Sequence, residues 1–413
     1  MKSAFLVSMM FCFLLWEGVA IGQTKKPFIS AWVQIGPETQ AIARVVTGES
    51  TCPKIFLDAR EEKMFLRVKP SQNFPVRICE KVIPASTTRA QINGIRLSIP
   101  QSRPRRILIL GDTGCRIKVI PGEKSVQNCH QPDAWPFLKV IQSAVEWRPD
   151  LVIHVGDYLY RESPCPAGSR GCRGSPWGDR WPTWNADFFS PAHALLASAP
   201  WVFVRGNHEL CSRAGEGWFR FLDSRSYSGE CKDDTDPFWI QLGRVQMAVL
   251  DSANAEDSKL DPIQVQNYLA QVKKIQKFPL QNGWLLTHRP IWAKSEQQFL
   301  NLTLQKAFQR NILSQWQLIL AGHMHIFGLF TFADDGPSQF ISGNGGTELY
   351  SIPTVPSGSK IGDRTIKKSR VIQKFGFMTL EATSAGGWIG VAHDANGKIL
   401  QQCSIEGSHV DCP

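Results

Sequence analysis

The feature that most constrains the fold is a series of short apolar runs, each long enough for one buried strand. They are RILIL (106–110), DLVIHV (150–155), WVFV (201–204), VQMAVL (245–250), GWLLT (283–287) and LILA (318–321). Two segments between them, 135–147 and 261–276, have the spacing of amphipathic helices, and Asp261 and Pro262 suit the start of the second. The alternation predicts an α/β fold whose helices cover the strands and whose functional loops gather at the carboxyl ends of the strands.

Strands without helices are expected on both sides of this region. Residues 24–102 are rich in Val, Ile, Thr and Arg and predict a small all-β domain, followed by a Pro- and Arg-rich linker at 99–106. From 339 to about 406 the chain returns to short strands and Gly-rich turns, which predicts a second, antiparallel sheet packed on the first. We therefore divide the chain into residues 1–22, 23–102 and 103–413.

The first 22 residues have the pattern of a secretory signal peptide. One Lys precedes an apolar run at 4–16, and small residues follow at 18, 20 and 22. The run is shorter than the ~18 residues that cross a bilayer, so an uncleaved anchor is the weaker alternative, and no later stretch is long enough to span. We expect an exported protein, secreted or, in a bacterial host, periplasmic.

Ten cysteines remain after the signal segment, and an even number in an exported chain predicts disulfides. Pairing of sequence neighbours would join 52 with 79, 115 with 129, 165 with 172, 211 with 231 and 403 with 412. The sequence does not prove this pairing. Zinc bound by cysteine is the weaker alternative, because the short CxxC spacing does not occur.

The charge of the chain favours anionic partners. The formal net charge is +10, which would attract anionic substrates by long-range steering. The basic runs RPRR (103–106) and KKSR (367–370) are more typical of solvated loops than of a nucleic-acid site, and no basic stripe is interleaved with aromatic residues. We therefore predict no nucleic-acid partner.

Five of the apolar runs lead into residue types that bind metal ions. The motifs are GDTG (111–114), GDYLY (156–160), GNHE (206–209), HRP (288–290) and GHMH (322–325). They present Asp112, Asp157, Tyr160, Asn207, His208, His288, His323 and His325. Such oxygen and imidazole donors suit two neighbouring ions, since one carboxylate can bridge both ions while the other donors cap each one. His154 lies inside a run and is expected to be a hydrogen-bonded core residue.

The ordered set GD-x-G, GD-x-x-Y, GNH-[DE], a strand-end H and GH-x-H resembles the purple acid phosphatase branch of the calcineurin-like metallophosphoesterases. The resemblance covers about residues 106–330 and implies two packed mixed β-sheets flanked by helices, here preceded by the small all-β domain. It implies a ferric ion held by Asp112, Asp157, Tyr160 and His325. It also implies a divalent ion, zinc, manganese or iron, held by Asp157, Asn207, His288 and His323. His208 would protonate the leaving group or bind the phosphate.

The activity implied by the resemblance is hydrolysis of phosphomonoesters at acidic to neutral pH by a metal-activated hydroxide. Gly114 stands where many two-metal phosphoesterases have a metal-binding histidine, and Tyr160 would take that role. A phosphodiesterase, nucleotidase or pyrophosphatase is the alternative on the same scaffold, and a catalytically silent surface binding protein is less favoured. The insertion 161–189 carries Trp177, Trp181 and Trp184, which either wall the substrate entrance or pack under a surface loop.

Overall fold

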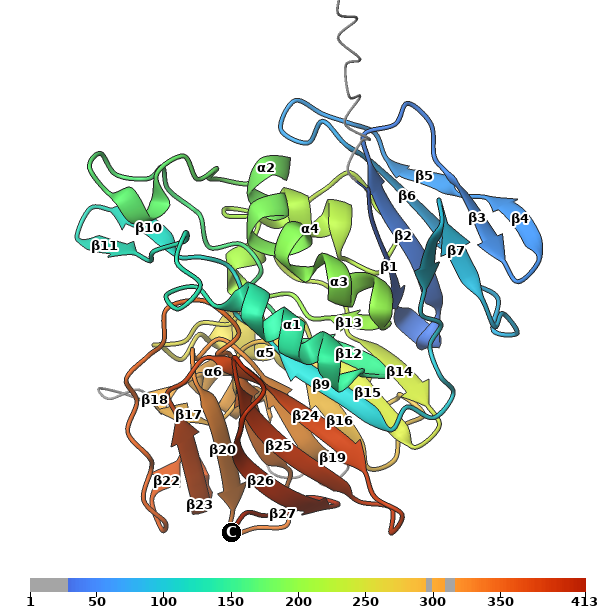
Figure 1. The fold of residues 1–413 in the computed structure, drawn as a ribbon. Coiled ribbons are helices and arrows are strands. Elements are labelled where there is room, and N and C mark those ends of the chain that lie inside the picture. Colours follow the sequence, from blue (N-terminus) through green and yellow to red (C-terminus); the bar gives the residue numbers. More distant parts are fainter. Residues whose placement is uncertain (1–28, 295–298, 309–315) are drawn as a thin grey trace, which may run out of the picture.

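The computed structural model describes residues 29–294, 299–308 and 316–413, and these form two large stacked β-sheets with helices on their outer faces (Figure 1). The first sheet has eleven strands in the order β27 (His409–Asp411), β26 (Ile399–Glu406), β25 (Trp388–Asp394), β24 (Gly376–Ala382), β9 (Arg106–Leu110), β12 (Leu151–His154), β13 (Trp201–Phe203), β1 (Ile29–Ile35), β2 (Ala41–Thr47), β6 (Arg77–Val82) and β5 (Phe65–Val68). The second has eight strands in the order β14 (Phe238–Leu242), β15 (Val245–Val249), β16 (Gly283–Leu286), β19 (Trp316–Ala321), β21 (Ser338–Ser342), β20 (Phe327–Phe332), β23 (Arg364–Ile372) and β22 (Lys360–Ile361).

All six apolar runs of the sequence form inner strands of these sheets, and none of them is an edge strand. In the first sheet β12 lies parallel to β9 and to β13. In the second sheet β15, β16 and β19 are parallel neighbours in the same way. The prediction of two mixed sheets flanked by helices is confirmed, and the parallel strands of each sheet bring their carboxyl ends to a common edge.

The hydrophobic core lies between the two sheets. Alternate residues of β9 serve different layers: Ile107 and Ile109 pack in the core shared with the second sheet, while Leu108 and Leu110 pack under the helices. Because β9 is buried on both faces, it reads as a continuous apolar run and not as an alternating one.

The helices cover the outer faces of the sheets (Figure 1). They are α1 (Phe137–Trp147), α2 (Trp181–Trp184), α3 (Ser190–Ser198), α4 (Gly215–Phe221), α5 (Pro262–Ile275) and α6 (Leu302–Ala307). The predicted start of α5 is confirmed, since the Asp261 side chain accepts hydrogen bonds from the backbone N–H groups of Ile263 and Gln264, at 2.9 and 3.1 Å. Its apolar side, with Tyr268 and Val272, packs on the second sheet.

The N-terminal strands extend the first sheet. β1 lies parallel to β13, with Gln34 opposite Trp201, and β2, β6 and β5 continue the sheet outward. A separate four-stranded sheet packs on this extension through a small apolar core, and its strands are β4 (Arg60–Lys63), β3 (Lys54–Leu57), β7 (Ala90–Ile92) and β8 (Ile95–Leu97). The domain boundary near residue 102 stays a prediction, and the signal segment 1–22 lies outside the described residues.

The prediction for the C-terminal region is wrong in one respect. The strands after residue 375 do not form a second sheet, because β24 pairs antiparallel with β9 and the strands β25, β26 and β27 extend the first sheet from there. Of the strands in this C-terminal region, only β21, β22 and β23 belong to the second sheet. The physical reason is that β9 would otherwise be an edge strand with unpaired backbone groups, and β24 satisfies them.

The five disulfides join the cysteines that neighbour one another in sequence, as expected. They are Cys52–Cys79, Cys115–Cys129, Cys165–Cys172, Cys211–Cys231 and Cys403–Cys412. Their number suggests an oxidising compartment. In the part of the chain that is described, no helix has the length and apolarity to cross a bilayer.

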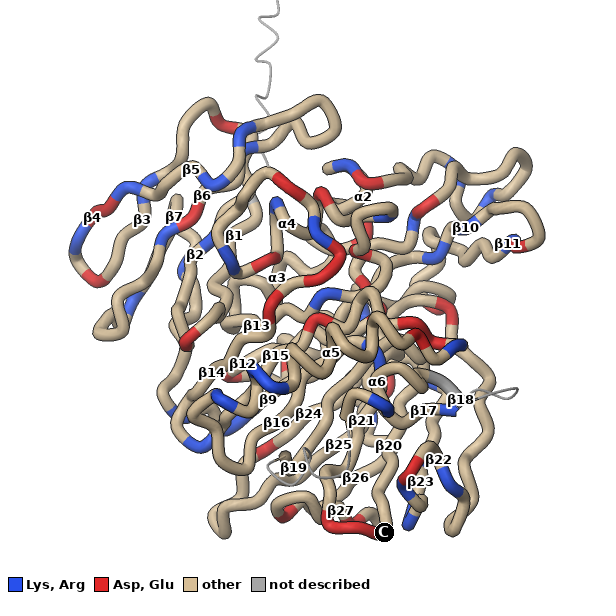
Figure 2. Tube along the Cα trace, turned by 180° about the vertical axis from the view of Figure 1, so that it is seen from behind, with Lys and Arg blue, Asp and Glu red and all other residues tan. Residues whose placement is uncertain are grey.

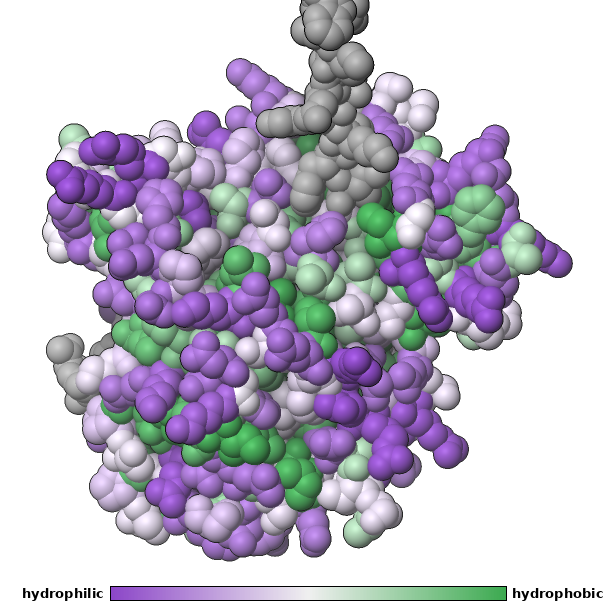
Figure 3. All heavy atoms as spheres, in the orientation of Figure 1, coloured by the Kyte–Doolittle hydropathy of each residue, from purple (hydrophilic) through white to green (hydrophobic). Residues whose placement is uncertain are grey.

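The surface is mixed in charge and mostly hydrophilic on the face in view. Figure 2 shows basic and acidic residues interspersed over both halves of the molecule. In Figure 3, hydrophilic residues cover most of the face seen in Figure 1, with hydrophobic patches between them. The net positive charge of the sequence is thus spread over many elements.

Candidate metal centre

The residues singled out in the sequence come together at one edge of the molecule, where the carboxyl ends of the parallel strands of both sheets meet. Asp112 follows β9, Asp157 follows β12, and Asn207 and His208 follow β13. From the second sheet, His288 follows β16, and His323 and His325 follow β19. Tyr160, in the same loop as Asp157, is the eighth, and hydrogen bonds and ion-pair distances connect all eight side chains into one cluster.

The backbone at this edge is held in an unusual conformation. Asp112, Asp157 and His323 have φ angles of 56°, 61° and 69°, in the left-handed region that side chains with a Cβ rarely adopt. Gly322 allows close packing here, because a Cβ at this residue would lie 2.6 Å from Oδ2 of Asp112. Such strain is found at functional sites, where surrounding contacts hold it in place.

The first half of the cluster is centred on the hydroxyl of Tyr160. This oxygen lies 2.9 Å from Oδ1 of Asp112, 2.9 Å from Oδ2 of Asp157 and 2.9 Å from Nε2 of His325. The Nδ1 atom of His325 lies 2.6 Å from the backbone oxygen of Glu348, so Nδ1 carries the proton and Nε2 is free to act as a ligand atom.

The second half is centred on the side-chain oxygen of Asn207. It lies 2.9 Å from Nε2 of His288 and 2.8 Å from Nδ1 of His323. Ligand atoms of Asp157, His288 and His323 lie within 4.8 Å of one another. Nδ1 of His288 lies 2.8 Å from the backbone oxygen of Val155, which fixes the ring and leaves Nε2 toward the cluster. Asp157 contacts both halves, because its Oδ2 atom is 3.3 Å from Nε2 of His288.

Burial perturbs the titration of these groups. Desolvation and the neighbouring Asp157 carboxylate raise the pKa of Asp112 well above its usual value. Burial also acts to raise the pKa of Asp157, but His288 and His208 outweigh it and hold that pKa well below the usual value. Burial, and next Asp112, raise the pKa of the Tyr160 phenol well above its usual value. Burial and Arg116 lower the pKa of His325.

These residues fit the pair of metal ions that the motifs imply. Two buried carboxylates, a phenol, an amide oxygen and three imidazoles meet here, and this set of oxygen and nitrogen donors is one that iron, zinc and manganese prefer. Two carboxylates at this burial need a compensating cation, and the raised pKa of Asp112 reports the cost of ionising both. An ion of high charge would also offset the raised pKa of Tyr160.

His208 lies at the rim of the cluster, beside the ring of Tyr160, with 3.8 Å between the ring centroids. Its Nδ1 lies 3.1 Å from the backbone oxygen of Leu159, and its Nε2 lies 3.8 Å from Oδ2 of Asp157. The guanidinium of Arg213 lies 2.7 Å from Nε2, and Glu162 holds that guanidinium in turn. Burial, and next Arg213, lower the pKa of His208 to about 4.

Glu209, the last residue of GNHE, has a structural role that the sequence analysis did not assign. Its fully buried carboxylate accepts hydrogen bonds from four backbone N–H groups. The donors are Gly206 at 3.1 Å, Asp157 at 3.1 Å, Tyr158 at 2.8 Å and Leu159 at 3.3 Å. Glu209 therefore ties the loop after β12 to the loop after β13, and so sets the distance between Asp157 and Asn207.

Two further charged residues near the second half were also missed. Oδ2 of Asp257 lies 2.9 Å from Nε2 of His323, which leaves Nδ1 of that ring toward Asn207. Arg289 pairs with Asp257, and its Nη1 atom lies 3.0 Å from Nε2 of His323. The only sequence signal was that Arg289 follows His288 directly; Asp257 lies in a loop without a recognisable motif.

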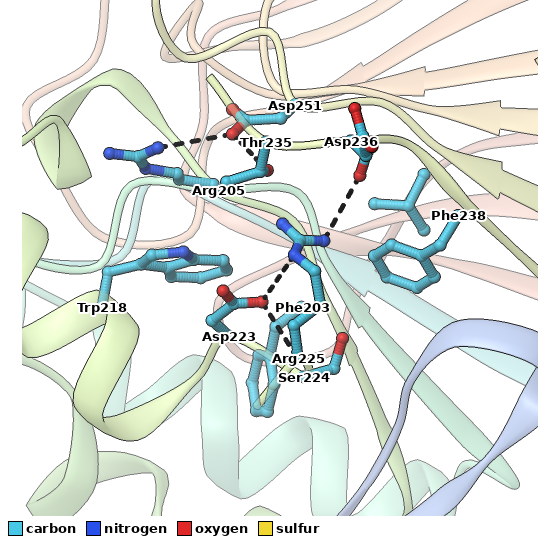
Figure 4. A pocket seen from close by; sticks show the side chains of 11 residues that line it. Phe203, Arg205, Trp218, Asp223, Ser224, Arg225, Thr235, Asp236, Phe238 and Asp251 are labelled. Carbon is cyan, nitrogen blue, oxygen red and sulfur yellow. Dashed lines mark hydrogen bonds and ion pairs between the residues drawn. The ribbon is translucent and has the colours of Figure 1, made fainter. Parts of the chain in front are cut away.

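Arg205 anchors the segment that leads into GNHE (Figure 4). Its Nε donates to the backbone oxygen of Glu209 at 2.9 Å, and its Nη1 lies 3.4 Å from Oδ2 of Asp251. The cavity beside it, drawn in Figure 4, has a volume of about 10 Å³, room for no more than about one water. The protein beside Arg205 therefore leaves no room for a ligand behind the segment that leads into Asn207 and His208.

Other sequence expectations can be placed in the same region. His154 is buried in β12, with its Nε2 atom 3.1 Å from the hydroxyl of Thr113, so it lies in the core as expected. Trp184 is fully buried and Trp181 packs partly buried against the same core, which favours packing under the loop. Trp177 is 40% exposed.

A family model described as calcineurin-like phosphoesterase matches residues 105–327, more than half of the chain. The chain belongs to this family. It is therefore a hydrolase of phosphate esters, and the family implies a dinuclear metal centre. None of the curated proteins matches its sequence.

Solved structures share the fold of this phosphoesterase. A purple acid phosphatase from yellow lupin (Lupinus luteus) seeds has 13% sequence identity and a TM-score of 0.58, covering 91% of this chain and 74% of that chain. The structure of PhoD has 10% identity and a TM-score of 0.56, covering 94% of this chain and 92% of that chain. At these identities the likeness establishes the metallophosphoesterase fold.

Proposed function

We propose that this phosphoesterase is an exported phosphatase of the purple acid phosphatase type that hydrolyses phosphomonoesters at acidic to neutral pH. One ion would be ferric, held by Asp112, Asp157, Tyr160 and His325. The other would be divalent, zinc, manganese or iron, held by Asp157, Asn207, His288 and His323.

The position of the Tyr160 hydroxyl carries the proposal. It lies at hydrogen-bond distance from Asp112, Asp157 and His325 together. A phenol ionises near pH ~10 in water, and burial raises the pKa of Tyr160 further. Such a group serves as an anionic ligand at acidic pH only beside a cation of high charge, which favours ferric over divalent iron at this position.

The side chains have distinct tasks in the proposed reaction. Two cations held here would supply positive charge to the phosphoryl oxygens and lower the pKa of a water molecule used as nucleophile. Asp157 contacts both halves of the cluster and so suits the bridging role. Val155 and Asp257 orient the rings of His288 and His323. His208, adjacent to Asn207 at the rim, is positioned to bind the phosphate or protonate the leaving group.

Export is part of the proposal, and the disulfides support it. Bonds such as Cys52–Cys79 and Cys211–Cys231 form and persist in oxidising compartments. The apolar run at 4–16 has the pattern of a signal peptide.

The decisive experiment is a visible absorption spectrum combined with metal analysis of the purified protein. We expect a charge-transfer band from the Tyr160 phenolate to ferric iron. Colourless protein that contains iron would contradict the assignment of Tyr160.

The substrate class is tested by comparing the hydrolysis of p-nitrophenyl phosphate with that of bis-p-nitrophenyl phosphate. Faster hydrolysis of the monoester is expected. Faster hydrolysis of the diester would favour the phosphodiesterase alternative. Hydrolysis of neither ester between about pH 4 and pH 8 by metal-loaded protein would favour a silent binding protein.

A further inference from the structure

A cleft of about 690 Å³ lies at the edge of the sheets opposite the metal centre. Its lining comes from the linker before β9, the turn between β14 and β15 and the turn after β24. The linker joins β9 at its amino end, and β24 runs antiparallel to β9, so both meet at this edge. The metal centre lies beyond the carboxyl end of β9, which is five residues or about 16 Å away.

The charged side chains that line this cleft are all arginines. Arg103 and Arg105 come from the linker, and Arg244 comes from the turn between β14 and β15. All three are exposed, and Figure 2 shows basic residues close together beside β9 and β14. Other arginines of the described residues form ion pairs with carboxylates, but these three form none. The cleft therefore has an uncompensated positive charge.

The linker that presents two of these arginines is held by its backbone. The Asp150 carboxylate accepts a hydrogen bond from the backbone N–H of Arg105 at 2.8 Å. Gly243 packs directly on the linker, because a Cβ there would lie 2.8 Å from the backbone oxygen of Ser102. The backbone around the cleft is thus set before a ligand binds, and only the side chains lose freedom on binding.

The polar groups of the cleft fit an oxyanion. Each guanidinium presents parallel N–H donors that match two oxygens of a phosphate or sulfate group. The Arg244 guanidinium lies 4.9 Å from the centre of the Trp388 ring, a cation–π contact that holds it in place. Thr383 and Ser384 add hydroxyl groups that can donate to further oxygens.

The arrangement favours a small ligand over a polymer. The arginines converge on one cleft, whose volume is within the range of sites for small molecules. A charged polymer would need a basic stripe that continues along the surface. The other basic run, 367–370, lies on β23, far from β14 in the order of the second sheet, and its Lys368 pairs with Asp411.

We propose that this cleft binds a small polyanion that carries several phosphate or sulfate groups, at a site separate from the metal centre. Arg103, Arg105 and Arg244 would each bind one of these groups, and the hydroxyls of Thr383 and Ser384 would donate to the oxygens between them. The site goes beyond the proposed phosphatase function and does not depend on it.

The test measures binding of myo-inositol hexasulfate, a small ring whose sulfate esters are not phosphate esters. Isothermal titration calorimetry compares the wild type with the triple variant Arg103→Gln/Arg105→Gln/Arg244→Gln at about 0.15 M salt. Glutamine keeps part of the aliphatic stem and removes only the charge. Circular dichroism checks the fold, and hydrolysis of p-nitrophenyl phosphate should be the same in both proteins.

The matched control removes the same charge from exposed arginines in or beside the separate four-stranded sheet, which does not line the cleft. This control variant is Arg60→Gln/Arg89→Gln/Arg96→Gln. The phosphate arm uses myo-inositol hexakisphosphate with the His208→Ala variant, which leaves the cleft intact and in which we expect slow turnover. Tighter binding of the hexasulfate or of the hexakisphosphate then shows which of the two groups the cleft prefers.

We expect the cleft variant to bind the hexasulfate at least about 10-fold more weakly than the wild type, and the control variant to bind it within about 2-fold. Equal weakening in both variants, or no binding by the wild type, would overturn the proposal. Hexasulfate that competes with p-nitrophenyl phosphate equally in the wild type and the cleft variant would place its binding at the metal centre and also overturn it.

Two further outcomes separate the alternatives. A heparin fragment that binds the cleft when the hexasulfate does not would overturn the choice of a small ligand. Protein that binds the hexasulfate as expected but hydrolyses no phosphate ester would overturn the proposed function and support the cleft. If the triple variant does not fold, Arg103→Gln and Arg244→Gln are measured singly, with a loss of about 2- to 3-fold expected for each.

Discussion

Replacing Glu209 by Gln tests whether one buried carboxylate holds the two central loops of the site together. Each carboxylate oxygen accepts two backbone N–H groups: Oε1 those of Tyr158 and Leu159, and Oε2 those of Asp157 and Gly206. A glutamine keeps only one such oxygen. In either orientation of the amide, two backbone donors then face an NH₂ group that cannot accept a hydrogen bond.

The cost follows from the number of donors left without an acceptor. Each buried donor left unsatisfied costs about 1–3 kcal/mol, so Glu209→Gln should lower the free energy of unfolding by about 2–6 kcal/mol. That is a large part of the roughly 5–15 kcal/mol that stabilises a typical folded protein. Burial, and next Asp157, raise the pKa of Glu209 to about 8, so the variant is compared with the wild type above that pH, where both oxygens of the carboxylate can accept. The measurement is urea denaturation of the disulfide-intact protein, followed by tryptophan fluorescence, together with metal analysis of the folded fraction.

The matched control is Glu216→Gln on α4. The Glu216 side chain is 44% exposed and pairs with Arg220 one turn along the helix at 2.8 Å, so its replacement should cost less than about 1 kcal/mol. A Glu209→Gln variant within about 0.5 kcal/mol of the wild type would refute the reasoning, because the loops would then not depend on the carboxylate.

Three further predictions concern the site and its surroundings. Tyr160→Phe should abolish the visible band and weaken iron binding at least about 10-fold, as read by absorption and metal analysis; retention of the band would mean that another residue produces it. His208→Ala should lower kcat about 10²–10⁴-fold with both metals still bound, and loss of metal would argue instead that His208 is a ligand. Burial raises the pKa of Asp179 to about 6, above its unfolded value of 3.8, so the stability linked to its neutral form is complete below pH 3.8 and is lost as pH rises through about 6. The control is Asp179→Asn, whose amide oxygen can still accept a hydrogen bond from Trp184. In urea denaturation at a series of pH values, the free energy of unfolding of the wild type should fall by up to about 3 kcal/mol relative to that of the control between pH 3.8 and about 6. If the free energies of unfolding of the two proteins vary with pH in parallel, the pKa of the Asp179 carboxyl is not perturbed.

The sequence was sufficient to predict the central strands and the residues at their ends, because both signals are local. RILIL is an apolar run that is buried on both faces, and the polar residue after it must lie at the carboxyl edge of the sheet. The partner of an antiparallel strand is not a local signal, which is why the pairing of β24 with β9 was missed. The contacts of Glu209 with Tyr158 and of Asp257 with His323 join residues 51 and 66 positions apart, and no motif links them.

Gly114 and Tyr160 are coupled through packing as well as through their proposed roles. A Cβ at Gly114 would lie 2.6 Å from the backbone oxygen of Tyr158 and 2.8 Å from the backbone nitrogen of Tyr160. The loop that delivers the tyrosine therefore lies directly on the glycine, and Asp187 holds it there by accepting from the Tyr160 N–H at 2.9 Å. A histidine at position 114 would need the space that this loop occupies. The loop geometry that brings the phenol within reach of Asp112 and Asp157 thus excludes the imidazole ligand that other two-metal phosphoesterases have there, and a single substitution at position 114 could not exchange one ligand for the other.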